Sequence, residues 1–284
     1  KSRLRRDGRD VVIKVCEVRN ARDALMSRSE VRNAARFGGG DIVTVFGAAF
    51  VESSGGTSRT FMLMEAATCD LRTFLSKRFR SLTSATKLRF AVQLLRALHK
   101  MAAAGYSHND VKPDNVLVFG NLSSPNDCHV KLADLGFALG KGETLPTVAG
   151  TREYMAPERF KGHANIGRSD AWSAGLVLFA LFVGRAPDAL SAIPFAHSGD
   201  AEVNDAWLRF LRKTFDILKE EGFVQLRRDD RQVARLIGMM LIKPAWARLD
   251  ISRALRRLMR ITRSRGIVVP EQANPSTLQG AWSV

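Results

Sequence analysis

The feature that most constrains this sequence is the polar stretch Tyr106–Leu117, which reads Tyr-Ser-His-Asn-Asp-Val-Lys-Pro-Asp-Asn-Val-Leu. It places an acid (Asp110), a cation (Lys112) and an amide (Asn115) within six residues. Helically spaced leucines precede the stretch and a short apolar run follows it, so the pattern predicts a loop that is held between a helix and a strand. Taken alone, the stretch has an alternative interpretation as a polar turn without chemistry.

The stretch resembles the catalytic loop of eukaryotic protein kinases, His-Arg-Asp-Leu-Lys-x-x-Asn, with His108, Asp110, Lys112 and Asn115 in register. The resemblance implies transfer of the γ-phosphate of ATP to a hydroxyl group. Asp110 would orient that hydroxyl and accept its proton, and Lys112 would offset the charge on the transferring phosphate. The amide oxygen of Asn115 would bind Mg²⁺. A lysine at this place is typical of members that act on serine and threonine.

The same resemblance implies an α+β fold with two lobes, in which residues 1–284 form one protein kinase domain. Residues 1–66 would be a small N-lobe, a mainly antiparallel β-sheet with one helix, αC. The hinge would lie at about 65–70, and residues 71–284 would form a larger, mainly α-helical C-lobe. A chain of 284 residues, 45% of them hydrophobic, is long and apolar enough for such a core.

Composition limits the other classes of function. The chain has 44 Lys and Arg against 28 Asp and Glu, so its net charge of +16 suits acidic substrates, phosphoinositides or nucleic acid. No nucleic-acid motif accompanies the basic residues, so specific nucleic-acid binding is not expected. The longest nearly uncharged apolar run, Ala171–Val183, is too short to span a bilayer. Three widely spaced cysteines, Cys16, Cys69 and Cys128, match no metal site or disulfide framework and are expected to pack in the core.

The beginning of the chain predicts a β-hairpin followed by a helix. Asp7-Gly8 separates two strand-like runs, and the second, Val11–Val15, resembles the Val-Ala-Ile-Lys strand of kinases. The resemblance implies that Lys14 binds the α- and β-phosphates of ATP. It also implies that Glu30, on a helix predicted over Asp23–Arg36, pairs with Lys14, and Asp23 is the weaker candidate for this partner.

Three glycines, Gly38–Gly40, follow this helix. Because they precede a strand, their order is the reverse of a phosphate-binding loop, and we interpret them as a helix end and a linker. The segments Ile42–Val51 and Thr60–Glu65 then predict a strand pair around a flexible turn. The resemblance also implies a nucleotide site. In it, Met64 would be the gatekeeper beside the adenine, and the backbone of the hinge, Glu65 to Ala67, would contact the purine. Asp70 would contact the ribose, and Val12 and Leu117 would lie above and below the adenine.

A second acid follows a short apolar strand, Val130–Ala133. Asp134-Leu135-Gly136 stands where kinases carry Asp-Phe-Gly, and the resemblance implies that Asp134 binds the Mg²⁺ that bridges the β- and γ-phosphates. Together with Asn115, Asp134 would complete the protein's part of the metal site. ATP and Mg²⁺ are therefore the expected substrate and cofactor.

The segment Gly150–Glu158 resembles the Gly-Thr-x-x-Tyr-x-Ala-Pro-Glu segment of kinases, which receives the protein substrate. The resemblance implies that Thr151 hydrogen-bonds near Asp110 and Lys112, and that Glu158 pairs with a distant arginine, Arg248. Asp170, at the start of the buried helix αF, would hold the backbone of the catalytic loop. These contacts would link the substrate segment to the core of the C-lobe.

The C-terminal part predicts a basic amphipathic helix, Ile251–Arg265, which carries six arginines. Such a helix can lie on an anionic membrane, or it can close the lobe with a solvated basic face, and we favour the second interpretation. Between the substrate segment and this helix, the pattern predicts only a loop and a helix around Trp207–Lys219.

The sequence departs from the kinase pattern in three places. Thirteen residues precede Lys14 and only Gly8 among them is a glycine, so we expect the glycine-rich loop to be absent from the chain, either because the chain was cut upstream or because the kinase lacks the loop. If the loop is truly missing, the chain is similar in this respect to secreted apicomplexan kinases of the rhoptry and dense-granule branch, which would place it in a parasite vacuole or host cell; an intracellular location is the alternative. Asn109 replaces the usual arginine, as in kinases without an Arg-Asp pair, so we expect phosphorylation of Thr144 or Thr147 to be unnecessary. Val12 stands where alanine is usual and narrows the adenine slot.

The leading interpretation is a serine/threonine protein kinase that uses Mg·ATP and acts on protein hydroxyl groups. Its four charged or polar site residues, Lys14, Asp110, Asn115 and Asp134, are all present. The alternative is a pseudokinase, a binding or scaffolding module of the same shape, which the missing loop and Val12 favour. Binding of nucleic acid or membranes through charge alone is a third class.

Overall fold

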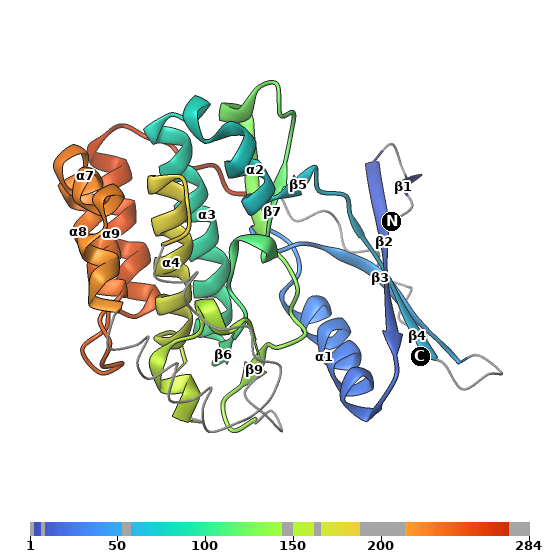
Figure 1. Cartoon of the computed structure of the whole chain (residues 1–284). Coiled ribbons are helices and arrows are strands. Elements are labelled where there is room, and N and C mark those ends of the chain that lie inside the picture. The colour runs from blue at the N-terminus through green and yellow to red at the C-terminus, as the bar shows by residue number, and fades with distance from the viewer. Residues whose placement is uncertain are drawn as a thin grey trace.

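The chain forms two lobes that lie side by side, one built on a sheet and one built from helices (Figure 1). The computed structural model describes residues 3–6, 9–52, 58–143, 150–161, 166–187 and 214–272. The sheet and one helix make up the smaller lobe, and the remaining long helices make up the larger one. This is the two-lobed α+β architecture that the resemblance implies.

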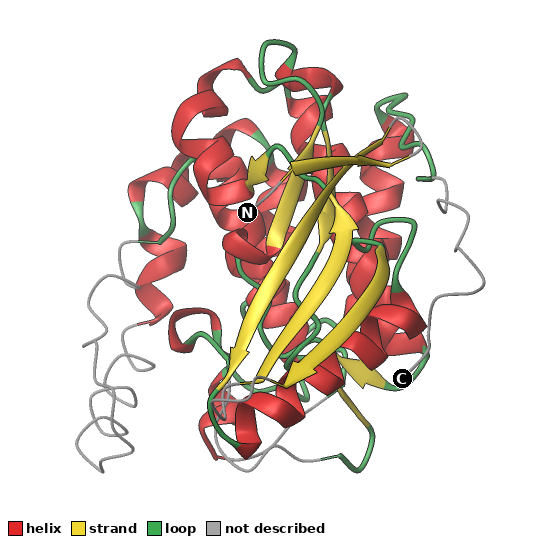
Figure 2. Cartoon of the chain, turned by 90° about the vertical axis from the view of Figure 1, so that its right-hand side faces the viewer, coloured by secondary structure: helices red, strands yellow, loops and turns green. Residues whose placement is uncertain are grey.

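A four-stranded antiparallel sheet forms the small lobe, with the strand order β1-β2-β4-β3 (Figure 2). Its central pair places Val12 opposite Met64 and Lys14 opposite Met62. Alternate side chains of β4 point to opposite faces, so Met62 and Met64 are buried on the face that carries Lys14. The strands are β1 (Arg3–Arg6), β2 (Arg9–Val18), β3 (Val45–Glu52) and β4 (Ser58–Glu65).

The hairpin at the start of the chain is confirmed, but the strand predicted from Ile42 begins later, at Val45. Ile42 forms an isolated parallel bridge with Leu132 of the large lobe and is 1% exposed. A contact between lobes, which a local pattern cannot reveal, therefore takes this residue out of the sheet.

Helix α1 (Ala21–Phe37) covers one face of the sheet and extends the predicted helix by a few residues. Asn20 caps it by accepting a hydrogen bond from the N–H of Asp23. Gly38 ends it, and a Cβ atom there would lie 2.6 Å from the carbonyl oxygen of Ala34. This close approach requires glycine and confirms the interpretation of the three glycines as a helix end.

The large lobe is built around α4, which is buried along nearly its whole length. Helix α3 supplies the buried leucines of the predicted helix before the catalytic loop. The bounds of the helices are α2 (Leu71–Arg78), α3 (Ser84–Ala103), α4 (Ser169–Val183), α7 (Glu221–Asp229), α8 (Arg231–Met240) and α9 (Ile251–Ser264).

Short strands and turns position the loops of the large lobe. One small sheet has the order β5-β7-β8, and β6 pairs with β9. The strands are β5 (Cys69–Asp70), β6 (Tyr106–Ser107), β7 (Val116–Phe119), β8 (His129–Leu132) and β9 (Leu139–Gly140). Short 3-10 helices span Phe79–Ser81, Pro113–Asn115, Pro125–Asp127, Arg152–Tyr154, Pro157–Lys161 and Thr214–Lys219.

Helix α9 closes the large lobe. Its apolar residues, among them Ile251, Leu255 and Leu258, are buried in the core beside α3 and α8, while its arginines lie on the outer face. The apolar face is therefore not available for insertion into a membrane. Of the helix predicted around Trp207–Lys219, Thr214–Lys219 forms a 3-10 turn and the rest lies outside the described residues. No described helix combines the length and apolarity needed to cross a membrane.

Candidate active site

The loop between β6 and β7 is hydrogen-bonded to a side chain in the first turn of α4. The two carboxylate oxygens of Asp170 accept hydrogen bonds from the backbone N–H groups of His108 (2.7 Å) and Asn109 (3.0 Å). The fully buried His108 ring lies between Ala133 and Asp110. Because a carbonyl oxygen can only accept, Nε2 donates to Ala133, and Nδ1 accepts from the N–H of Asp110. These contacts fix the backbone on which Asp110 stands.

The Asp110 carboxylate is surrounded by donors. One oxygen accepts from the backbone N–H of Thr151 at 2.7 Å, and the other lies 2.9 Å from Nδ2 of Asn115 and 3.0 Å from Nζ of Lys112. Lys112 also donates to Oγ1 of Thr151 at 2.6 Å. Burial alone would raise the pKa of Asp110, but the Lys112 ammonium and the Thr151 hydrogen bonds outweigh it and lower that pKa. The predicted group of Asp110, Lys112, Asn115 and Thr151 is therefore brought together, with its acid ionised.

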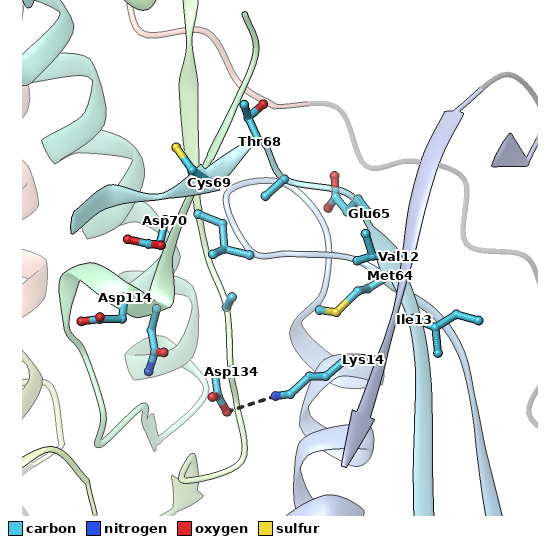
Figure 3. Close-up of a pocket in the computed structure, with 14 residues that line it drawn as sticks. Val12, Ile13, Lys14, Met64, Glu65, Thr68, Cys69, Asp70, Asp114 and Asp134 are labelled. Carbon is cyan, nitrogen blue, oxygen red and sulfur yellow. Dashed lines mark ion pairs between the residues drawn. The ribbon is translucent and has the colours of Figure 1, made fainter. Parts of the chain in front are cut away.

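Lys14 joins the two lobes at the cleft. Its ammonium lies 2.6 Å from Glu30 on α1. It also lies 3.7 Å from Asp134, which follows β8, and Figure 3 marks this second ion pair. Burial disfavours the ammonium, but the carboxylates of Asp134 and Glu30 outweigh burial and raise the pKa of Lys14. The predicted partner of Lys14 is therefore correct. Asp134 adopts a left-handed backbone conformation, with φ of 61°, that turns its side chain toward the cleft.

A cavity of about 410 Å³ lies between the lobes beside this ion pair (Figure 3). It is mainly apolar toward the strands and the hinge and polar toward the catalytic loop, as a purine nucleotide with its phosphates requires. Of the residues predicted to form the nucleotide site, Ala66 and Glu30 do not line the cavity and the others do. Its lining includes Val12, Lys14, Met64, Glu65, Ala67, Asp70, Asn115, Leu117 and Asp134.

Two of these side chains have further contacts that limit their roles. The Glu65 carboxylate pairs with Lys131 at 2.6 Å and accepts from the N–H of Thr44 at 2.6 Å, and the backbone N–H of Glu65 donates to the carbonyl of Thr44, so these contacts hold Glu65 in place. Asp70 caps α2, and its oxygens accept from the N–H and the hydroxyl of Thr73 at 2.8 and 2.9 Å. A carboxylate has further lone pairs, so Asp70 can still accept a bond from a ribose hydroxyl.

The ligands present at the phosphate end suit Mg²⁺. Asn115 donates through Nδ2 to the backbone oxygen and the carboxylate of Asp110, which leaves its amide oxygen to accept or to bind a cation. The Asp134 side chain is 38% exposed at the cleft. Among the described residues, no group of three or more His, Cys, Asp or Glu could hold a metal. A site with two protein oxygen ligands, completed by phosphate and water, is the type that Mg²⁺ prefers.

The segment after Gly150 is tied to the core by an ion pair. Arg248, whose side chain is 0% exposed, donates to both oxygens of Glu158 at 2.7 and 3.0 Å. It also donates to three backbone carbonyls, those of Ile242, Lys243 and Arg168. The predicted partner of Glu158 is therefore correct. The segment that contains Thr151 and Glu158 is thus fixed to the core by a buried guanidinium whose donors are all used.

The sequence did not reveal two asparagines that contact the segment after Asp134. Asn33, on the buried face of α1, donates to the carbonyls of Leu135 and Ala138. Asn109 donates to the carbonyl of Phe137 at 3.0 Å. A polar residue one turn after Glu30 on the same face was the available signal for Asn33. Thr144 and Thr147, at which the sequence predicts that phosphorylation is unnecessary, lie outside the described residues.

Comparison with known proteins agrees with this geometry. The sequence profile of the protein kinase domain matches residues 1–258. The serine/threonine-protein kinase unc-51 of Caenorhabditis elegans is 36% identical over 124 residues, 42% of this chain and 14% of that protein. CBL-interacting protein kinase 4 of Oryza sativa subsp. japonica is 38% identical over 138 residues, 46% and 29% of the two chains. The probable serine/threonine-protein kinase PknB of Corynebacterium glutamicum is 30% identical over 192 residues, 63% and 28%.

The matched part thus spans less than a third of the length of each of these relatives. The family profile, in contrast, covers the sheet, the cleft and most of the large lobe of this chain. The chain belongs to the protein kinase domain family.

Proposed function

We propose that the protein is an active serine/threonine protein kinase that transfers the γ-phosphate of Mg·ATP to protein hydroxyl groups. One observation carries the proposal: Lys14 lies within 3.7 Å of Asp134 while it is paired with Glu30 at 2.6 Å. The cation for the nucleotide phosphates and the acid for the metal thus face the same cavity, which is lined by both lobes.

Each group then has a role in the reaction. Lys14 would bind the phosphates of ATP, and Asp134 and the amide oxygen of Asn115 would hold Mg²⁺, whose positive charge would offset the charge of the phosphates. Asp110 orients the substrate hydroxyl and receives its proton as the new bond from oxygen to phosphorus forms. The bond from the γ-phosphorus to ADP breaks, and Lys112 offsets the charge that develops on the transferring group.

The preference for serine and threonine is supported by Lys112, which contacts both Asp110 and Thr151. It is also supported by the relatives, whose names describe serine/threonine kinases. The partner is therefore a protein that presents a serine or threonine in an accessible segment.

Autophosphorylation with labelled ATP and Mg²⁺ tests the proposal without knowledge of the substrate. We expect Asp134→Asn to lower incorporation by about a hundredfold or more, because it removes a negative metal ligand with little change in shape. Asp229→Asn makes the same chemical change on the exposed face of α7 and should leave incorporation intact. Equal incorporation in the wild type and Asp134→Asn, or none in either, would contradict kinase activity.

The second candidate is a pseudokinase that binds through the same shape without turnover. Val12, whose side chain lines the adenine end of the cavity, is the observation that favours it. Nucleotide binding by the wild type together with no incorporation under any Mg²⁺ concentration would support this candidate. Attraction of anionic membranes by the arginines of α9 would act through charge alone, because the apolar face of the helix is buried.

A further inference from the structure

Three backbone carbonyls just after Asp134 accept hydrogen bonds from two asparagine side chains that come from opposite lobes. Asn33 of α1 donates to Leu135 at 3.1 Å and to Ala138 at 3.0 Å. Asn109 of the catalytic loop donates to Phe137 at 3.0 Å. We call this set of contacts the asparagine clasp.

The chemistry of the partners fixes the orientation of both amides. Carbonyl oxygens can only accept, so each asparagine must present its NH₂ group to the segment. The remaining oxygens, Oδ1 of Asn33 and Oδ1 of Asn109, are buried without a hydrogen-bond partner in the part of the chain that the structure describes. Asn33 is 0% exposed. Burying an amide oxygen without a hydrogen-bond partner costs free energy of folding. We therefore interpret these two asparagines as residues whose NH₂ groups, and not their oxygens, are needed at positions 33 and 109.

The small-lobe half of the clasp is coupled to the ion pair of Lys14. Asn33 follows Glu30 by three residues, so the two side chains lie on the same buried face of α1. The position of the helix that brings Glu30 to 2.6 Å from Lys14 also brings Asn33 onto Leu135 and Ala138. A shift of α1 away from the cleft would break both sets of contacts together.

The large-lobe half is anchored in the core. The backbone N–H of Asn109 donates to Asp170, and its side chain also donates to the carbonyl of Ser107 at 3.2 Å. Its φ of 67° lies in the left-handed region, which asparagine tolerates better than most residues. Asn109 therefore connects the segment after Asp134 to the buried first turn of α4.

We infer that Asn33 and Asn109 are positioning residues that hold Asp134 in the cleft and α1 against it by neutral hydrogen bonds, without a phosphate group on the chain. An amide at position 109 presents no positive charge to a phosphate, and its donors are already used by backbone carbonyls. The effect on turnover rests on the proposed kinase activity, but the clasp itself does not.

Amide hydrogen exchange tests the clasp without nucleotide or turnover. The N–H groups of Ala138 and Lys141 are hydrogen-bonded to Leu135 and Gly105 and report on the segment. In phosphatase-treated protein we expect Asn33→Asp and Asn109→Gly each to raise exchange in residues 135–143 by about tenfold or more, because the carbonyls of Ala138 and Phe137 lose their side-chain donors. Glycine tolerates the left-handed conformation, so Asn109→Gly removes the amide without adding backbone strain.

Asn20→Asp is the matched control. It makes the same chemical change on α1, but Asn20 acts as an acceptor for the N–H of Asp23, a role that aspartate keeps. Slow exchange in the wild type and in Asn20→Asp, with fast exchange in both other variants, supports the clasp. Unchanged exchange in either Asn33→Asp or Asn109→Gly, or an equal rise in all three, would overturn it.

The Mg²⁺ dependence of autophosphorylation connects the clasp to the reaction. If Asp134 is less often in place, half-maximal activity of Asn109→Gly should require a Mg²⁺ concentration several times higher than in the wild type. An unchanged Mg²⁺ requirement together with fast exchange would overturn the positioning role. If the wild type has a protected segment and no turnover, the kinase activity fails and the clasp stands.

Discussion

Lys14 and Asp134 approach to 3.7 Å between Nζ and Oδ1, although one belongs to the sheet of the small lobe and the other follows a strand of the large lobe. Glu30 holds the same ammonium from α1. The Lys14 ammonium thus contacts both Glu30, which positions it, and Asp134, which is proposed to bind the metal. The relative placement of the two lobes is therefore part of the site.

Lys14→Met should weaken binding of Mg·ATP by about tenfold or more, because it removes the cation that faces the phosphates and leaves two carboxylates close together. The dissociation constant can be measured by calorimetry. Lys77→Met, on the exposed face of α2, removes the same charge far from the pair and should bind as the wild type does. Equal affinities in both variants would contradict the proposed nucleotide site.

Val12→Ala should tighten nucleotide binding a few-fold, because it removes two methyl groups from the wall of the cavity. The comparison of dissociation constants for ATP and ADP measures this effect. Val11 is 2% exposed and does not line the cavity, so Val11→Ala should lower stability without tightening binding. Weaker binding of ATP to Val12→Ala would show that the valine supports the adenine instead of crowding it.

The acid limb of the pH profile should depend on Lys112. The lowered pKa of Asp110 means that its carboxylate stays ionised until the pH falls below its ordinary value of about 4. The stability that its contacts provide is present above that pH and is lost as the pH falls through the lowered pKa. Lys112→Met leaves burial to raise the pKa, so the acid limb of kcat/KM should move to higher pH. A limb at the same pH in Lys112→Met and Lys77→Met would count against this assignment.

Arg248→Met should lower the free energy of unfolding by about 3–5 kcal/mol, because it leaves the Glu158 carboxylate and three carbonyls without their partner in a buried setting. Urea unfolding measures the change. Arg19→Met breaks a pair with Glu17 whose side chains are 73% and 48% exposed, so its midpoint should stay close to that of the wild type. Similar losses of unfolding free energy in Arg248→Met and Arg19→Met would contradict the view that burial makes the Arg248–Glu158 pair the more important one for stability.

The residues proposed for chemistry could be identified from the sequence because each belongs to a short motif whose spacing is local. Lys14, Asp110 and Asp134 were found in this way, and the partners Glu30 and Arg248 came from the order of the motifs. Asn33 was missed, because its position one turn after Glu30 marked it only as a polar residue on that face, and its acceptor Leu135 lies 102 residues away. The start of β3 was misplaced for the same kind of reason, since Ile42 bridges to Leu132. The absence of a glycine-rich loop stays a prediction.

Asp170 supplies two main-chain hydrogen bonds to the catalytic loop from a helix that is among the least exposed in the described chain. Asp110, the proposed proton acceptor, therefore stands on one of the most buried parts of the described chain, whereas the proposed nucleotide site also depends on a four-stranded sheet and one helix. On warming, we expect the protein to release its nucleotide reversibly at a lower temperature than that at which the large lobe, which carries Asp110, unfolds. Cooling should then restore turnover without refolding of the large lobe.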